Sequence, residues 1–210
     1  MGNLALLCLI AGFVDGFGYF ALGHVFAANM TGNTVLLAVA LAAGDWPAVG
    51  RFGATLAAFA VGVAGAALLR RRDASPLPPL LLEAAILGLS YVPGPFATLL
   101  LLAFAMGLQG ATPVGSGTTR SQTIVLTATI VRLTESAIDW LAPRPGANQP
   151  TSREIAAASG AAWVAYGAGA ALGVAALEAS ANPLAIRRAS GSSSHCGSSA
   201  AASLCDFRPL

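Results

Sequence analysis

Residues 52–69 form an apolar run without a single charged side chain, and the run stops at three consecutive arginines, Arg70 to Arg72. A helix that crosses a bilayer needs about 20 mostly apolar residues at a rise of 1.5 Å per residue. A soluble protein of this size has no reason to keep so long a stretch free of charge. We interpret residues 52–69 as a transmembrane helix, and this feature constrains the fold more than any other.

The composition extends this interpretation to the whole chain. Of its 210 residues, 56% are hydrophobic and 10% are charged, and the mean hydropathy is +0.71. A soluble domain carries roughly 25% charged residues. The sequence therefore predicts an all-α, multi-pass transmembrane helical bundle whose main partner is the lipid bilayer. The net charge of +2 is small and scattered, which argues against nucleic acid as a partner.

About seven spans are expected. The first has no basic residue before it and no early small-residue cleavage site after it, so we interpret it as a retained helix and not as a cleaved signal. The transmembrane domain covers residues 1–188, and the Ser, Ala and Gly-rich tail 189–210 is predicted to be disordered. The predicted spans are residues 4–22, 25–43, 52–69, 80–92, 96–111, 122–141 and 155–177.

The arginines indicate an orientation. With seven spans, six arginines, Arg70 to Arg72 among them, fall on one side and three on the other. Cytoplasmic loops carry the excess of basic residues. This count predicts an N-terminus outside and a C-terminus in the cytoplasm.

A weak internal repeat relates the two parts of the chain. Residues 11–16 resemble residues 105–110, and residues 33–37 resemble residues 122–126. Duplicated halves with interrupted helices are typical of small-solute transporters. The alternative is a chance match between apolar segments. The predicted halves are residues 4–92 and 96–178.

Asp15 is the sharpest candidate for a functional residue, because it follows eleven uninterrupted nonpolar residues of the first span. A carboxylate at the centre of a bilayer costs roughly 2.5–3.5 kcal/mol on insertion scales, so it needs a partner or a water-filled cavity. Functionally, it would bind a proton, a cation or a polar solute. Alternatively, it pairs internally and fixes helix packing. Glu83, in the fourth span, remains ambiguous.

The polar stretch Met30 to Thr34 predicts a break in the second span, which Gly32 would permit. Irregular backbone at membrane depth is tolerated only inside protein or beside water. The alternative is an interfacial loop in which Asn or Thr caps a helix. The candidate substrate- or ion-binding residues are Asp15, His24, Asn29, Thr31, Gly32, Asn33, Thr34, Gln109 and Thr123.

No catalytic, metal-binding or cofactor motif is present in the sequence. A Gly-x-Ser-x-Gly turn, a Walker A loop, paired histidines and a Cys-x-x-Cys pair are all missing. We therefore expect a protein that is not an enzyme and that uses no cofactor.

The residues carry a resemblance to a known family. Residues 11–15, residues 26–34 and residues 105–109 resemble the YoaK family, bacterial multi-pass membrane proteins with a domain of unknown function. The resemblance covers residues 4–177 and implies a helical bundle in the bacterial inner membrane. Members usually have Asn where this chain has Gly110. The residues that the resemblance marks are Asp15, Met30, Thr31, Gly32, Asn33 and Gln109.

Two hypotheses about function follow. The first is a transporter of a small solute or ion that uses a polar cavity around Asp15 and the Met30 to Thr34 break. The second is a membrane scaffold or assembly factor that transports nothing. The sequence determines neither the substrate nor the oligomeric state.

Overall fold

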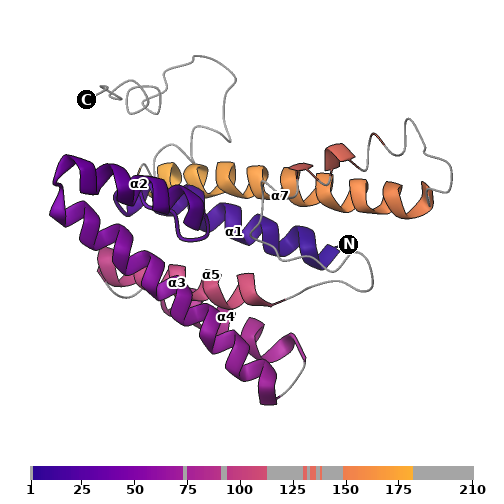
Figure 1. Ribbon diagram of the computed structural model, residues 1–210, viewed down its shortest axis with the longest axis horizontal. Coiled ribbons are helices and arrows are strands. Elements are labelled where there is room, and N and C mark those ends of the chain that lie inside the picture. Colours follow the sequence, from indigo (N-terminus) through magenta and orange to yellow (C-terminus); the bar gives the residue numbers. More distant parts are fainter. Residues whose placement is uncertain are drawn as a thin grey trace. The chain divides into compact units, whose positions relative to one another are not determined.

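The computed structural model describes residues 2–72, 75–90, 94–112 and 149–181, with a few residues between 130 and 138 (Figure 1). All regular structure in these ranges is helical, which confirms the predicted fold class. The predicted span 122–141 lies mostly outside the described residues, as do Thr123 and the tail 189–210. The principal helices are α1 (Gly2–Ala21), α2 (Met30–Ala43), α3 (Trp46–Arg72), α4 (Leu77–Leu89), α5 (Pro95–Ala111) and α7 (Gln149–Ala181).

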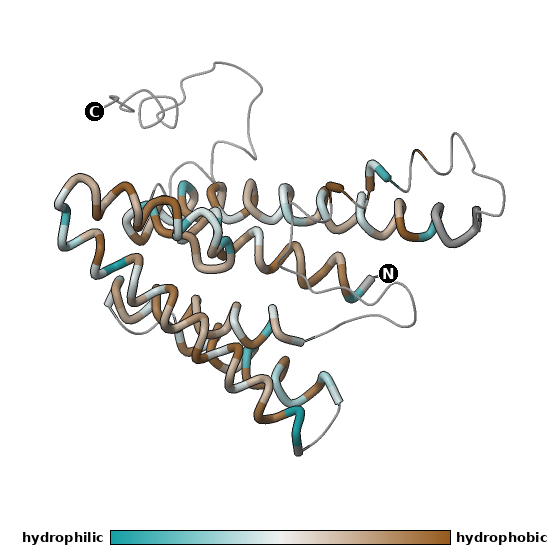
Figure 2. The backbone as a smooth tube through the Cα atoms, in the orientation of Figure 1, coloured by the Kyte–Doolittle hydropathy of each residue, from teal (hydrophilic) through white to brown (hydrophobic). Residues whose placement is uncertain are grey.

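Three described helices are long and apolar enough to cross a membrane: Asn3–Ala21, Trp46–Arg71 and Glu154–Ser180. The helices α2, α4 and α5 are apolar but shorter, with 14, 13 and 17 residues. The tube coloured by residue hydropathy is mostly brown or pale along these helices, with short teal segments between (Figure 2). This length difference matters for α2, because 14 residues cover only about 21 Å of a hydrocarbon core of about 30 Å.

Local hydrogen bonds set both ends of α2 and the start of α3. The Asn29 side chain accepts a hydrogen bond from the Gly32 amide at the start of α2, and Gly44, with φ of 69°, ends that helix. The Asp45 carboxylate accepts from the Ala48 amide in the first turn of α3. These are ordinary N-cap and left-handed C-cap arrangements. They make the connection between α2 and α3 a tight one.

Helices α1 and α7 approach each other as closely as helices can. A Cβ atom on Gly12 would lie 2.0 Å from the carbonyl oxygen of Tyr166, and one on Gly169 would lie 2.0 Å from that of Leu9. Gly16 meets Ala170 in the same way, one turn further along both helices. Small residues of this kind allow backbones to pack directly in membrane proteins. Because the contacts advance together, α1 and α7 run parallel.

Helices α3 and α5 make a second contact of the same kind. A Cβ on Gly107 would lie 2.2 Å from the carbonyl oxygen of Phe59, and one on Gly62 would lie 2.1 Å from that of Phe104. Gly65 then faces Leu108, so these two helices are also parallel. The two contacts have the same spacing. In each, a glycine of one helix contacts a backbone carbonyl of the other helix, and the second glycine lies three residues after that carbonyl.

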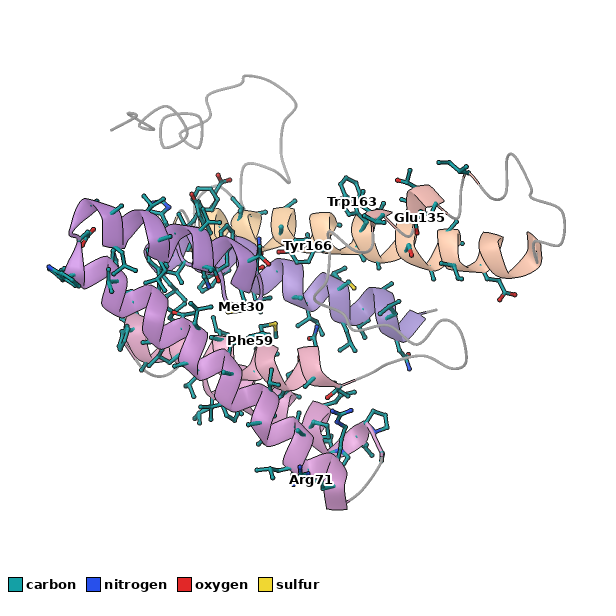
Figure 3. All side chains as sticks on the ribbon, viewed as in Figure 1. Met30, Phe59, Arg71, Glu135, Trp163 and Tyr166 are labelled. Carbon is teal, nitrogen blue, oxygen red and sulfur yellow. The ribbon has the colours of Figure 1, made fainter. Side chains whose placement is uncertain are left out.

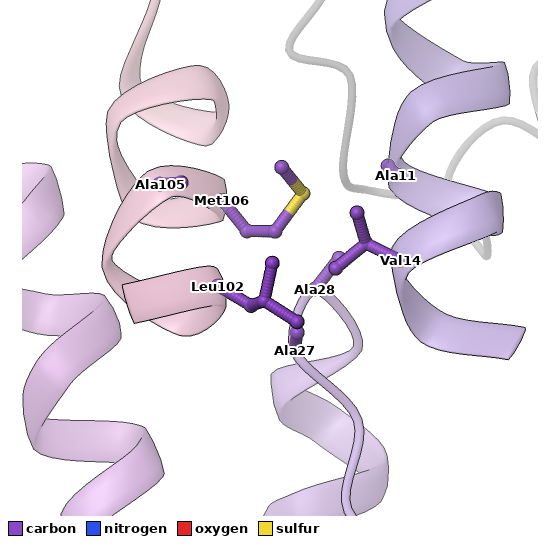
Figure 4. Close-up of a cluster of buried hydrophobic side chains, with 7 residues drawn as sticks. All are labelled: Ala11, Val14, Ala27, Ala28, Leu102, Ala105 and Met106. Atoms are coloured by element: carbon purple, nitrogen blue, oxygen red, sulfur yellow. The ribbon is translucent and has the colours of Figure 1, made fainter. Parts of the chain in front are cut away.

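Helices α1 and α5 run in opposite directions. Gln109, near the end of α5, donates to the carbonyl of Leu7, near the start of α1. Leu102, earlier in α5, lies in one buried cluster with Val14, later in α1 (Figure 4). The two helices are therefore antiparallel, and α3, which is parallel to α5, is also antiparallel to α1.

This inversion determines which helix ends lie at the same end of the bundle. The start of α1 and the end of α3, where Arg70 and Arg71 lie, are at the same end of the bundle. The sequence interpretation placed them on opposite sides, because it counted residues 25–43 as a separate crossing. In the structure, residues 22–29 are irregular and α2 is too short to cross alone.

Two buried clusters form the core around the start of α2. Ala11, Val14, Ala28 and Met106 belong to the first (Figure 4), and Val25, Phe52 and Leu99 belong to the second. By contacts the chain divides into two units, Met1–Leu177 and Glu178–Leu210, and everything discussed below lies in the first. The predicted repeat of residues 33–37 stays a prediction, since residues 122–126 are not described.

Candidate functional site

The segment between α1 and α2, residues 22–29, is irregular backbone, and its middle part is buried inside the bundle. Val25 and Ala27 are fully buried and Ala28 nearly so. Gly23 and His24, with φ of 85° and 60°, turn the chain back from the end of α1. Buried backbone without helical hydrogen bonds needs other partners at membrane depth.

Asp15 supplies the first set of partners. Its carboxylate is 2% exposed, and it accepts a hydrogen bond of 2.6 Å from the Ala28 amide. The amides of Ala27 and Asn29 also face it. These amides immediately precede α2, and the dipole of that helix also favours a negative charge near its start. A side chain of α1 thus binds the beginning of α2 across the returning segment.

Tyr166 of α7 supplies the fourth donor. Its hydroxyl donates to the other carboxylate oxygen of Asp15 over 2.5 Å, and the Tyr166 side chain points from α7 toward α1 (Figure 3). The carboxylate therefore joins α1, α7 and the start of α2. Sequence reasoning missed Tyr166. The signal for it was available, since a phenol hydroxyl inside an apolar span needs a polar partner.

The contact between α3 and α5 has no counterpart of Asp15 and Tyr166. Tyr166 provides the carbonyl that Gly12 meets, and the corresponding carbonyls of the second contact belong to Phe59 and Phe104. Asp15 lies three residues after Gly12, whereas Gly65 and Gly110 lie three residues after the glycines of the second contact. The second contact thus lacks both the carboxylate and the hydroxyl.

Asn33 holds the returning segment from the other side. It is fully buried, and its Nδ2 donates to the Phe26 carbonyl over 2.6 Å while its Oδ1 accepts from the Phe26 amide over 3.0 Å. Nδ2 also lies 3.8 Å from the Met30 sulfur. One side chain thereby satisfies both backbone groups of a residue that has no helical partner. Gly32 leaves room for the Phe26 ring, 3.0 Å from where a Cβ would be.

The other predicted residues occupy different places. His24, Asn29, Thr31 and Thr34 are exposed. The His24 ring packs edge-on against Tyr19, with centroids 4.9 Å apart, and not against Asp15. Asn29 is the N-cap of α2, and the Thr34 hydroxyl donates to the Met30 carbonyl.

The predicted break at Met30 to Thr34 is therefore misplaced. These residues form the first turn of α2, and the irregular segment precedes them at residues 22–29. The physical reason is that the polar residues stabilise the start of the helix and do not interrupt it. Asn29 caps α2, and the Asn33 side chain binds the backbone of the segment before it. Gly32 is helical.

Gln109 belongs to a separate contact. It is fully buried in α5, and its amide donates over 3.0 Å to the carbonyl of Leu7. Leu7 lies eight residues before Asp15, about 12 Å along α1. The structure thus brings Asp15 and Asn33 to one segment and leaves Gln109 elsewhere in the bundle. Within the described residues, no group of three or more metal-ligating side chains is present.

Exchanging amide for carboxylate tests the roles of the two asparagines. Asn33→Asp replaces the donor that faces the Phe26 carbonyl with a second acceptor, so we expect a loss of about 1–3 kcal/mol or more, the cost of an unsatisfied buried group. Asn29→Asp keeps an equally good N-cap and should leave stability nearly unchanged. Thermal unfolding in detergent, followed by tryptophan fluorescence, compares the two. Equal melting temperatures would remove Asn33 from this role.

The apolar helices and the buried, tethered segment between α1 and α2 define a multi-pass transmembrane protein. The family model described as "Protein of unknown function (DUF1275)" matches residues 3–189, and the chain belongs to this family. It is also 37% identical, over 146 residues, to the "UPF0700 transmembrane protein YoaK" of Bacillus subtilis (strain 168). That alignment covers 63% of this chain and 64% of the relative, so it spans slightly less than two thirds of the relative's length. No solved structure matches the chain.

Proposed function

We propose that this protein moves a small polar solute or a cation across the membrane, and that the 22–29 segment is its moving part. The observation that carries the proposal is the buried irregular backbone of this segment, tethered by Asp15 and Asn33. Interrupted helices in the bundle interior mark the solute site in many transporters. A helical bundle that serves only to pack its helices together does not need an interrupted helix in its interior.

The helix directions support the same proposal. Helix α1 is antiparallel to α5, and each packs through glycines against a long helix from the other predicted half, α7 and α3 respectively. Many transporters are built from two halves of inverted topology, and transport occurs when one half rocks against the other. Asp15 lies where such a motion would have to separate α1 from α7.

Asp15 provides a chemical trigger for this motion. A proton or cation that binds the carboxylate competes with the amides of residues 27–29, since neutralising the charge weakens the hydrogen bonds that it accepts. The start of α2 would then be released, and its amides would become available to a solute.

A second candidate function is a membrane scaffold or assembly factor. The observation in its favour is that the polar atoms of Asn33 and the carboxylate of Asp15 already have partners inside the protein. In a scaffold these bonds would simply fix the packing, as internally satisfied polar groups do in helical bundles.

Solute flux into proteoliposomes distinguishes the two. Inward gradients of glycerol, urea, glycine and sodium acetate would be applied, with swelling followed by light scattering and internal pH by trapped pyranine. We expect one of these classes to enter faster than into protein-free liposomes. Asp15→Asn should slow that entry roughly ten- to hundredfold, the equivalent of losing about 1.5–3 kcal/mol of interaction with a charged group.

The matched control is Asp45→Asn, which keeps a surface helix cap outside the site and should transport like the wild type. Equal flux through wild type and Asp15→Asn would remove Asp15 from the mechanism. A folded wild-type protein that passes none of the solutes would favour the scaffold.

We further propose that this protein lies in the bacterial inner membrane and catalyses no reaction. If Arg70 and Arg71 lie on the cytoplasmic side, the inverted helix directions support an N-terminus on that side as well.

A further inference from the structure

Glu83 is a second buried carboxyl group, remote in sequence from the tethered segment. Helix α4 presents Pro79, Glu83 and Ser90 inward, and all three are buried, whereas Leu81 and Leu89 on its other side are largely exposed. Glu83 itself is only 2% exposed. Its carboxyl group therefore lies inside the bundle and not at the lipid surface.

The surroundings of Glu83 differ from those of Asp15 in one decisive respect. Both carboxyl oxygens of Glu83 are buried, and neither has a hydrogen-bond partner in the part of the chain that the structure describes. Asp15, by contrast, accepts from backbone amides and a hydroxyl. An ionised carboxylate buried without a partner is so unfavourable that such a group takes up a proton instead.

The charged groups around Glu83 are few. Helix α4 packs against α3 and α5, and residues 95–111 of α5 carry no ionisable side chain. On α3, Arg70 is the candidate counterion for Glu83, because its Nε is also buried and has no partner among the described residues. Helical side chains lean toward the start of their own helix. By this rule the Arg70 side chain is directed away from the connection between α3 and α4 and the Glu83 side chain toward it, and no ion pair joins them in the described part of the chain.

We propose that Glu83 is a proton-binding site within the membrane-embedded bundle. In the described state one carboxyl oxygen carries the proton. When Arg70 moves within pairing distance, the O–H bond breaks, its electron pair stays on the carboxylate, and the proton passes to water. The proposal does not depend on transport, because it concerns the charge of one side chain in the folded protein.

Infrared spectroscopy of the full chain in lipid tests this directly. A protonated carboxyl has a C=O stretch above the amide bands that shifts in D2O. We expect this band in the wild type at neutral pH and its loss in Glu83→Gln, with Glu135→Gln, at an exposed position, as the matched control that retains it. Identical carboxylic-acid bands in wild type and Glu83→Gln would overturn the proposal.

Two further variants keep the test decisive. Glu83→Asp retains a carboxylic acid, so the band should persist at a shifted frequency even if Glu83→Gln fails to fold. Arg70→Met should leave the band in place. A band that appears only in Arg70→Met would also overturn the proposal, because Glu83 would then be ionised and paired with Arg70 in the wild type.

Discussion

Replacing Asp15 with alanine is expected to lower the free energy of unfolding by at least about 3 kcal/mol, because each buried donor that loses its acceptor costs about 1–3 kcal/mol. The variant leaves the Ala28 amide and the Tyr166 hydroxyl without an acceptor, together with the neighbouring amides just before α2. Asp15→Asn should be milder, since its amide oxygen still accepts. Thermal unfolding in detergent and denaturation with SDS measure the difference.

Two controls separate the tether from general effects of losing a side chain. Tyr166→Phe removes one of the donors and leaves the amides satisfied, so its loss should be about 1–3 kcal/mol. Asp45→Ala removes an exposed helix cap and should cost about 0.5–2 kcal/mol. If Asp15→Ala were no less stable than Asp45→Ala, the carboxylate would not hold the three elements together.

Gly169→Ala should be the most damaging single-methyl addition in α7. The new Cβ would lie 2.0 Å from the Leu9 carbonyl oxygen, and this contact is with backbone, which cannot rotate away. Overpacking of this kind typically costs 1–3 kcal/mol and occasionally more. We expect α1 and α7 to be pushed apart, with a melting temperature well below that of the wild type.

Gly167→Ala, two residues earlier in the same helix, is the matched control. Nothing lies within 4 Å of a Cβ there, so alanine should be neutral or stabilise the helix by about 0.5–1 kcal/mol. Opposite shifts of the melting temperature for the two variants would confirm the close contact. Equal shifts would mean that α1 and α7 do not approach at Gly169.

The apolar pattern predicted the helices well, and the polar residues predicted the site only in part. Asp15 could be found from sequence because a carboxylate among eleven nonpolar residues demands a partner. Which partner it takes could not be read, since Tyr166 lies 151 residues away and meets it only when α1 and α7 pack. His24 was a candidate binding residue because of its place in the sequence, but its exposed ring packs against Tyr19.

The bounds of the second predicted span differ from the structure for a related reason. Residues 25–43 are apolar enough to suggest a crossing, but hydropathy does not record whether the backbone is helical. The side chains of Asp15 and Asn33 stabilise an irregular return at residues 22–29, and this leaves α2 only 14 residues long. With α2 no separate crossing, the start of α1 and the arginines at the end of α3 lie at the same end of the bundle.

The sequence by itself determined that this chain is a bundle of apolar helices in a membrane, because hydrophobicity is a property of each residue and adds along a segment. Only the tertiary structure decided which helices meet, in which direction they run, and what Asp15 binds. Those outcomes depend on backbone contacts between glycines far apart in the chain, and on hydrogen bonds that exist only once the helices have packed.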